Sequence, residues 1–151
     1  MKTTLMKFLN SRSVILGAIF AGSLLFNTSV QAAEKADGQM KIPSTSEAIW
    51  QSIDKEAEQL AALIQTSNFE EVHHHAYAIR DLVAALPARS GTLPPEKIAQ
   101  IKTNSKFVAT LAERLDTTGD AKDKAGTESN FRKLQGVLNA IRADYPKTDR
   151  K

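Results

Sequence analysis

The stretch V72-H-H-H-A-Y-A-I-R-D-L-V-A-A-L-P87 decides the fold class. Its apolar residues recur at spacings of three and four, a period that places them on one face of an α-helix. We expect this helix to begin at Asn68, with Glu71 completing a capping box, and to end at Pro87. The stripe consists of Phe69, Val72, Ala76, Ile79, Val83 and Leu86.

Three further segments show the same helical period, and no segment alternates in the way a strand does. They are residues 47–66, which Ser44 and Glu47 cap as a box, residues 95–116, and residues 121–144, which Pro146 closes. The sequence therefore predicts an all-α, up-down-up-down four-helix bundle. The three stripes are Ile49, Ile53, Ala57, Leu60 and Ile64, with Trp50 at the edge; Ile101, Ser105, Val108, Ala112 and Leu115; and Phe131, Leu134, Leu138, Ile141 and Tyr145.

The N-terminus has the pattern of a secretory signal peptide. Positive charge alone precedes an apolar run over residues 14–26, which is shorter than the roughly 20 residues of a membrane span, and small residues follow at Ala32. We expect cleavage after Ala32, and hence a signal peptide at 1–32, a flexible leader at 33–43, the bundle at 44–146 and a disordered tail at 147–151. The absence of cysteine excludes lipid attachment and disulfides. The product is expected to be periplasmic, without a membrane span after processing.

The formal net charge of +3 belongs to the predicted signal peptide. Lys2, Lys7 and Arg12 account for all of it, so the processed chain has as many basic as acidic side chains. No basic stripe with interleaved aromatic residues is left. Nucleic acid is therefore not an expected partner.

All three histidines of the chain lie side by side at His73, His74 and His75. Successive residues of a helix point about 100° apart, so adjacent side chains diverge. We therefore expect that the triplet does not chelate one metal ion by itself.

Two of these histidines are candidate metal ligands with neighbouring carboxylates. His74 points away from the apolar stripe, beside Glu70 and Asp81, which allows an open, weak surface site. His75 flanks the stripe near Glu71, from where it can meet ligands on another helix. Simple solvation is the alternative for His74, and it is the one that we favour.

A purely structural role is the alternative for His75. Antiparallel pairing of the second and third helices places Asn104 and Ser105 near its level, and a hydrogen bond to Asn104 satisfies both side chains. His73 lies beside Arg80, whose charge disfavours a metal ion there.

The acidic loop at residues 116–126 superficially resembles a calcium-binding loop. It lacks the glycine and the glutamate that an EF-hand requires at its sixth and twelfth positions. We expect helix caps instead, with Gly119 ending one helix, Asp120 starting the next and Asp123 in the first turn.

Catalytic machinery is not apparent in this sequence. The histidines all fall on one helix, and no serine occupies a strand-to-helix turn where it could act as a nucleophile. Haem attachment is not expected, because the chain has no cysteine and Met40 is the one methionine left after processing. The sequence thus favours a protein without enzymatic activity.

Three segments carry a resemblance to a group of known proteins: H75-A-Y-A-I-R-D-L-V-A-A-L-P87, L115-D-T-T-G-D-A-K-D-K-A-G126 and K133-L-Q-G-V-L-N-A-I-R-A-D-Y-P146. They resemble small bacterial periplasmic helical proteins associated with heavy-metal efflux and resistance loci. The resemblance implies a helical fold and a metal-tolerance context. It implies no ligand set.

Two functions of different class follow. The first is a metal-binding or metal-buffering bundle that holds copper, zinc, nickel or cobalt with His74 or His75 and nearby carboxylates. The second is a metal-free interaction or adaptor module, with a periplasmic protein or a second copy of the chain as its partner. Phe107 belongs to the second function, since it projects away from the apolar stripe and an exposed aromatic can anchor a partner.

Overall fold

The computed structural model describes residues 40–145, and these residues form four α-helices without a strand. The all-α four-helix fold predicted from the sequence is therefore confirmed. The predicted signal peptide, most of the leader, Pro146 and the tail lie outside the described residues. The helices are α1 (Ser46–Thr66), α2 (Val72–Arg89), α3 (Pro95–Asp120) and α4 (Lys124–Arg142). None of these helices is both long and apolar enough to cross a membrane.

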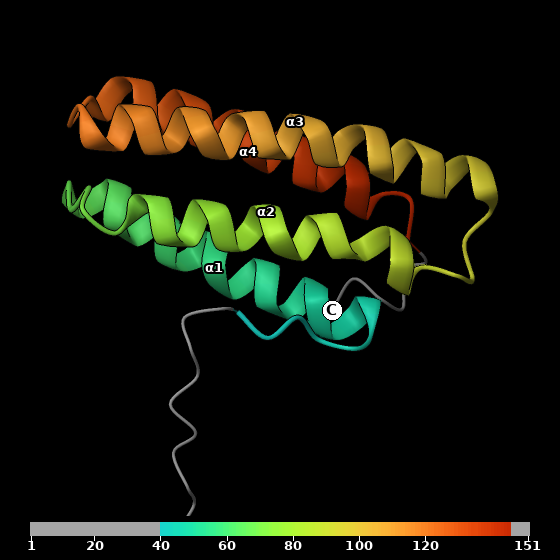
Figure 1. The fold of residues 1–151 in the computed structure, drawn as a ribbon. Helices are drawn as coiled ribbons and strands as arrows, with labels where there is room; N and C mark the ends of the chain where they lie inside the picture. The colour runs from blue at the N-terminus through green and yellow to red at the C-terminus, as the bar shows by residue number, and fades with distance from the viewer. Residues whose placement is uncertain (1–39, 146–151) are drawn as a thin grey trace, which may run out of the picture. The chain divides into compact units, whose positions relative to one another are not determined.

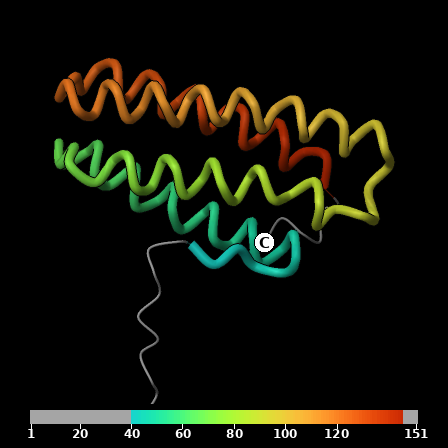
Figure 2. The backbone as a smooth tube through the Cα atoms, viewed as in Figure 1, coloured from blue at the N-terminus to red at the C-terminus, as the bar shows by residue number. Residues whose placement is uncertain are grey.

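Consecutive helices run in alternating directions (Figures 1 and 2). The side-chain contacts between α2 and α3 give the register, because Tyr77 pairs with Asp116 while Val83 lies opposite Ser105. Residue numbers rise along α2 as they fall along α3. The contacts of α4 with α1 and with α3 follow the same antiparallel rule.

The predicted stripes form one apolar core, to which every helix contributes. Helix α2 buries the broadest face, because it packs on α1 along one side and on α3 along the other. Burial of these aliphatic side chains is the main favourable contribution to folding. Ile42, within the predicted leader, also packs against this core. The largest side chains with almost no exposed surface are Ile49, Ile53, Leu60, Ile79, Leu82, Leu86, Ile101, Leu115, Leu134 and Ile141.

The predicted cap of α1 was wrong by one residue. Thr45, and not Ser44, is the N-cap, and its hydroxyl accepts a hydrogen bond from the Ala48 backbone N–H at 3.2 Å. Either side chain satisfies the cap preference, so the sequence pattern alone did not separate them.

The predicted start of α2 was also wrong. The helix begins at Val72, and the side chain of its N-cap, Glu71, makes no capping hydrogen bond. Asn68 instead belongs to the end of α1, where its N–H donates to the Leu63 carbonyl at 2.9 Å after Ser67 adopts the left-handed conformation. These backbone bonds satisfy carbonyls that a helix C-terminus leaves free.

Pro87 does not end α2, which continues to Arg89. A proline within a helix deprives the carbonyl four residues earlier of its donor, and here that carbonyl belongs to Val83. The Ser105 hydroxyl, which donates to Ile101 O at 2.8 Å, also lies 3.5 Å from Val83 O. Ser105 thus supplies from α3 part of the hydrogen bonding that Pro87 removes.

The turn between α3 and α4 lies later than the sequence predicted. Gly119 is buried inside α3, where an added Cβ would come within 3.2 Å of Val72 Cγ1, so close helix packing explains this glycine. Lys122 takes the left-handed conformation, with φ at 54°. Asp123, and not Asp120, is the N-cap of α4, and its carboxylate accepts the Gly126 N–H at 3.0 Å.

We predict that the processed chain folds without any cofactor, because its apolar stripes already form a continuous core. Far-ultraviolet circular dichroism and the thermal unfolding curve should be unchanged after exhaustive treatment with EDTA. Loss of most of the helical signal on chelation would instead make a metal ion part of the fold, as in small metal-dependent domains.

Candidate functional site

His75 faces α1, and its partner is Glu56. The ring Nδ1 lies 2.7 Å from Glu56 Oε2, and both side chains are about one-fifth exposed. The predicted contact of His75 with Asn104 on α3 was therefore wrong. α2 packs between α1 and α3, and a side chain on the flank of its stripe turns toward one of them only. The N–H of the imidazole donates to the carboxylate, so the bond holds α1 and α2 together.

His74 lies on the surface as predicted, with 65% of its side chain exposed, but its acidic neighbour is Glu71. His74 Nε2 and Glu71 Oε2 are 3.7 Å apart, one helical turn along α2. The His73 and His74 rings approach each other, with centroids 3.9 Å apart and planes inclined at 40°. The prediction that all three histidines diverge was thus wrong for this pair, because side-chain rotation brings together rings that start about 100° apart.

The other predicted ligands are not gathered around His74. Asp81 accepts a hydrogen bond from Arg80 Nε at 2.8 Å, and Glu70 is an exposed residue of the turn before α2. Within residues 40–145, no three histidine or carboxylate side chains are arranged so that they could hold a metal ion. The structure brings together pairs, His75 with Glu56 and His74 with Glu71.

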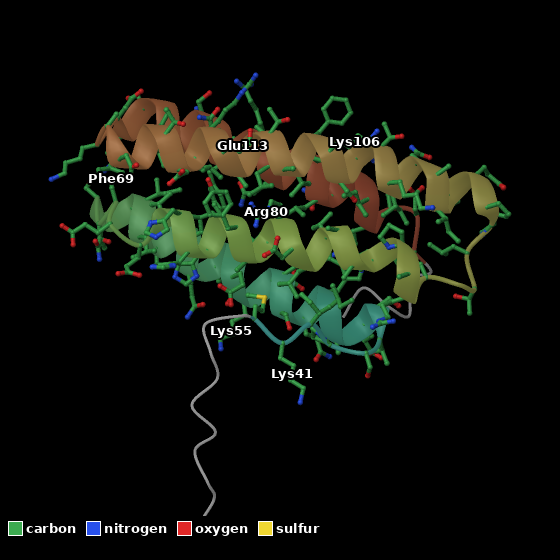
Figure 3. All side chains as sticks on the ribbon, viewed as in Figure 1. Lys41, Lys55, Phe69, Arg80, Lys106 and Glu113 are labelled. Carbon is green, nitrogen blue, oxygen red and sulfur yellow. The ribbon has the colours of Figure 1, made fainter. Side chains whose placement is uncertain are left out.

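A second polar contact joins α2 to α3. The Tyr77 hydroxyl donates to Asp116 Oδ2 at 2.8 Å, and the Arg80 guanidinium lies over the Tyr77 ring at 4.5 Å from its centroid. Figure 3 labels Arg80 on α2 and Glu113 on the adjacent α3. The hydrogen bond to Asp116 raises the pKa of Tyr77 above its ordinary value, and burial and the negative charge of Asp116 raise it further.

The pair α1 and α4 is the loosest of the neighbouring helix pairs. Near the start of α1, Arg142 of α4 joins the two helices, because its guanidinium lies over the Trp50 ring at 4.3 Å from the centroid. The same guanidinium donates from Nη2 to Asp54 Oδ1 at 2.5 Å. At the opposite end, Lys124 Nζ donates to Gln65 O at 3.4 Å.

A pocket of about 270 Å³ opens between these two joined ends. Ile53, Leu138 and the Trp50 ring lie behind its wall and are almost without exposed surface, so the accessible lining is more polar than apolar. Polar side chains line the rest, and among them Asp54 and Arg142 carry opposite charges. The full lining is Trp50, Ile53, Asp54, Ala57, Gln135, Leu138, Asn139 and Arg142.

Trp50 contacts two side chains, Arg142 over its ring and Tyr145 at its edge. The Trp50 and Tyr145 ring centroids are 5.6 Å apart, and the Tyr145 hydroxyl is 2.6 Å from Ser90 Oγ. Ser90 in turn donates to Leu86 O at 2.6 Å. An aromatic ring held in this way forms a rigid wall for the pocket.

The sequence indicated Trp50 only as a residue at the edge of the α1 stripe. Asp54 and Arg142 are 88 residues apart in the chain. Their pairing, and with it the pocket, could have been found by assuming antiparallel α1 and α4 and matching charges along the two helices.

The exposure predicted for Phe107 is confirmed. It is 57% exposed, and Met40 is the other large apolar residue with a substantial exposed fraction within the described part of the chain. Since single exposed apolar residues are common on soluble domains, Phe107 by itself does not define an interface.

No family model, curated protein or solved structure matches this chain. The association with metal efflux and resistance therefore stays a prediction, and function is argued from the geometry of the site.

We predict unequal effects of removing the histidine rings on stability. His75→Ala should lower the free energy of unfolding by about 1 kcal/mol, because it leaves the partly buried Glu56 carboxylate without its donor. His74→Ala should change it by less than about 0.5 kcal/mol, as expected at an exposed position. Urea unfolding of both variants at pH 7.5 provides the comparison, and equal losses would contradict the contact between α1 and α2.

We predict that the Tyr77 hydrogen bond stabilises the fold at neutral pH and is lost in alkali. The raised pKa means that the folded state favours the protonated phenol, so this stability is complete below the ordinary tyrosine pKa of about 10 and falls as the pH rises through the folded value. At pH 7, Tyr77→Phe should be about 1 kcal/mol less stable than the natural chain. Urea unfolding between pH 7 and 11 should show that difference shrinking, and a difference independent of pH would count against the bond.

Proposed function

We propose that the chain, once exported, is a non-enzymatic binding module whose ligand occupies the pocket between α1 and α4. The observation that carries this proposal is the pocket of about 270 Å³, with its pair of opposite charges. Ligand sites in proteins are concave and contain a few polar groups that orient the ligand. The proposal shares the absence of metal with the second function expected from the sequence but replaces its protein partner with a small molecule.

The position of the pocket supports a binding role. Three neighbouring helix pairs are packed closely along their lengths, whereas α1 and α4 meet mainly at their ends. Closer packing here would bury more of the partly exposed Ala57, which would stabilise the fold. A space left open at this interface, with rigid aromatic support on one wall, is suited to a ligand that completes the packing.

The size of the pocket indicates a small organic ligand. Pockets for drug-sized molecules have volumes of about 300–1,000 Å³, and this one lies just below that range. The groups around it are aliphatic side chains, two amides, an indole and one ion pair. These groups favour recognition by shape, hydrogen bonds and charge, which is the chemistry of reversible binding.

Metal binding has weaker support from the geometry. Copper, zinc, nickel and cobalt need several nitrogen or oxygen ligands around one ion, while His74 and His75 each face one carboxylate. Any ion bound by the exposed His74 and Glu71 pair would be held weakly.

The pocket can be tested with the chain's own fluorophore, because Trp50 is its single tryptophan. We predict that at least one class of small molecules, among amino acids, carboxylates, amines and sugars, changes the Trp50 emission of the processed protein in a saturable way. Asn139→Phe places a bulky ring at an exposed position of the lining and should abolish that response. Ala140→Phe, the matched control at the adjacent exposed position, should retain it.

Both variants should unfold at similar urea concentrations, since neither position belongs to the core. The proposal is wrong if none of the four classes alters the emission, or if the two phenylalanine variants respond alike.

A further inference from the structure

We propose that the pocket between α1 and α4 binds a small zwitterion, an α-amino acid with an aliphatic side chain. This inference rests on the proposed function and adds the class of ligand. It is carried by the juxtaposition of Asp54 and Arg142 in one pocket that also presents a small apolar area.

The charges around the pocket select among ligands. Asp54 and Arg142 are hydrogen-bonded to each other, so the pair is neutral as a whole. A ligand with only a carboxylate is attracted by Arg142 and repelled by Asp54. A ligand with only an ammonium group is attracted by Asp54 and repelled by Arg142. A zwitterion avoids both penalties, because its carboxylate can lie beside Arg142 while its ammonium group lies beside Asp54.

Neither side chain has to give up its partner to bind such a ligand. A guanidinium has five N–H donors, and the recorded contact of Arg142 with Asp54 uses Nη2 only. Asp54 accepts with Oδ1, and its side chain is 44% exposed. The ammonium and carboxylate groups of an amino acid can therefore add to the existing pair, giving a ring of four alternating charges.

The Trp50 ring orients the Arg142 guanidinium for binding the ligand carboxylate. The guanidinium lies over the ring, and the contact restricts its motion in the absence of ligand. Because Trp50 is itself held by Tyr145, the charge is positioned before the ligand arrives. A group positioned in advance loses less conformational freedom on binding.

The ligand's side chain has a small apolar area to contact. Ala57 is the partly exposed aliphatic residue of the lining, and Ile53 and Leu138 lie almost fully buried behind it. Gln135 and Asn139 add amide groups that can donate to the ligand carboxylate or accept from its ammonium group. An aliphatic amino acid of the size of leucine is small enough for a pocket of about 270 Å³.

Isothermal titration calorimetry of the processed protein at pH 7 tests the charge requirement with three matched compounds. Leucine carries both charges, leucinamide lacks the carboxylate, and 4-methylpentanoate lacks the ammonium group. We expect leucine to bind at least about tenfold more tightly than either analogue, because each analogue loses one charged hydrogen bond and faces one like charge.

Two substitutions should change this preference in opposite ways. Asp54→Asn should weaken leucine binding by about tenfold or more and strengthen the binding of 4-methylpentanoate, because it removes the anion that repels the carboxylate. Arg142→Gln should weaken leucine binding and strengthen the binding of leucinamide. Arg132→Gln, at an exposed position of α4 that is not part of the lining, is the matched control and should bind leucine as the natural chain does.

Asp54→Asn should fold as the natural chain does, since Asp54 is partly exposed and asparagine has nearly the same shape. A loss of leucine binding in this variant therefore reports the lost charge. The inference is overturned if leucine gives no binding isotherm, if both analogues bind as tightly as leucine, or if Asp54→Asn leaves all three affinities unchanged. The proposed function can survive that result. A different ligand that alters Trp50 emission and is blocked by Asn139→Phe would preserve the binding module and refute the zwitterion.

Discussion

Burial of α2 on two sides is the constraint on which the rest of the structure depends. Its apolar residues pack against α1 and α3 together, which fixes these three helices and leaves α4 to pack mainly on α3. The interface between α1 and α4 then has few core residues of its own. Arg142 closes one end of it by lying over Trp50 and pairing with Asp54, and the pocket is the space that these contacts leave.

The histidine segment and the Asp54–Arg142 pair have different physical explanations. The imidazole of His75 donates to Glu56 and helps to hold α1 against α2, so folding alone accounts for its position. The Asp54 and Arg142 pair lies instead at an open interface and lines the pocket between α1 and α4. A partly exposed ion pair adds little stability, about 1 kcal/mol or less, and the role that we propose for this pair is recognition of a ligand.

The sequence predicted the helices well because their apolar period is strong and burial of aliphatic surface dominates folding. Helix ends depend on small competing local effects, which is why Thr45 rather than Ser44 caps α1 and why α2 continues past Pro87. The partner of His75 was predicted on the wrong helix, because the stripe of α2 does not show toward which neighbour its flank turns. The pocket was not predicted, because finding it requires knowing which residues of α1 lie opposite which residues of α4.

The most direct test of the account is the indole N–H resonance of Trp50, the single tryptophan of the chain, in a ¹H–¹⁵N spectrum of the processed protein. On titration with leucine, we predict a saturable shift of this resonance, together with shifts of backbone amides around residues 50–57 and 135–142. Amides of α2 near the histidines should stay in place. An unchanged indole resonance at saturating leucine, or shifts confined to the histidine segment, would contradict the account.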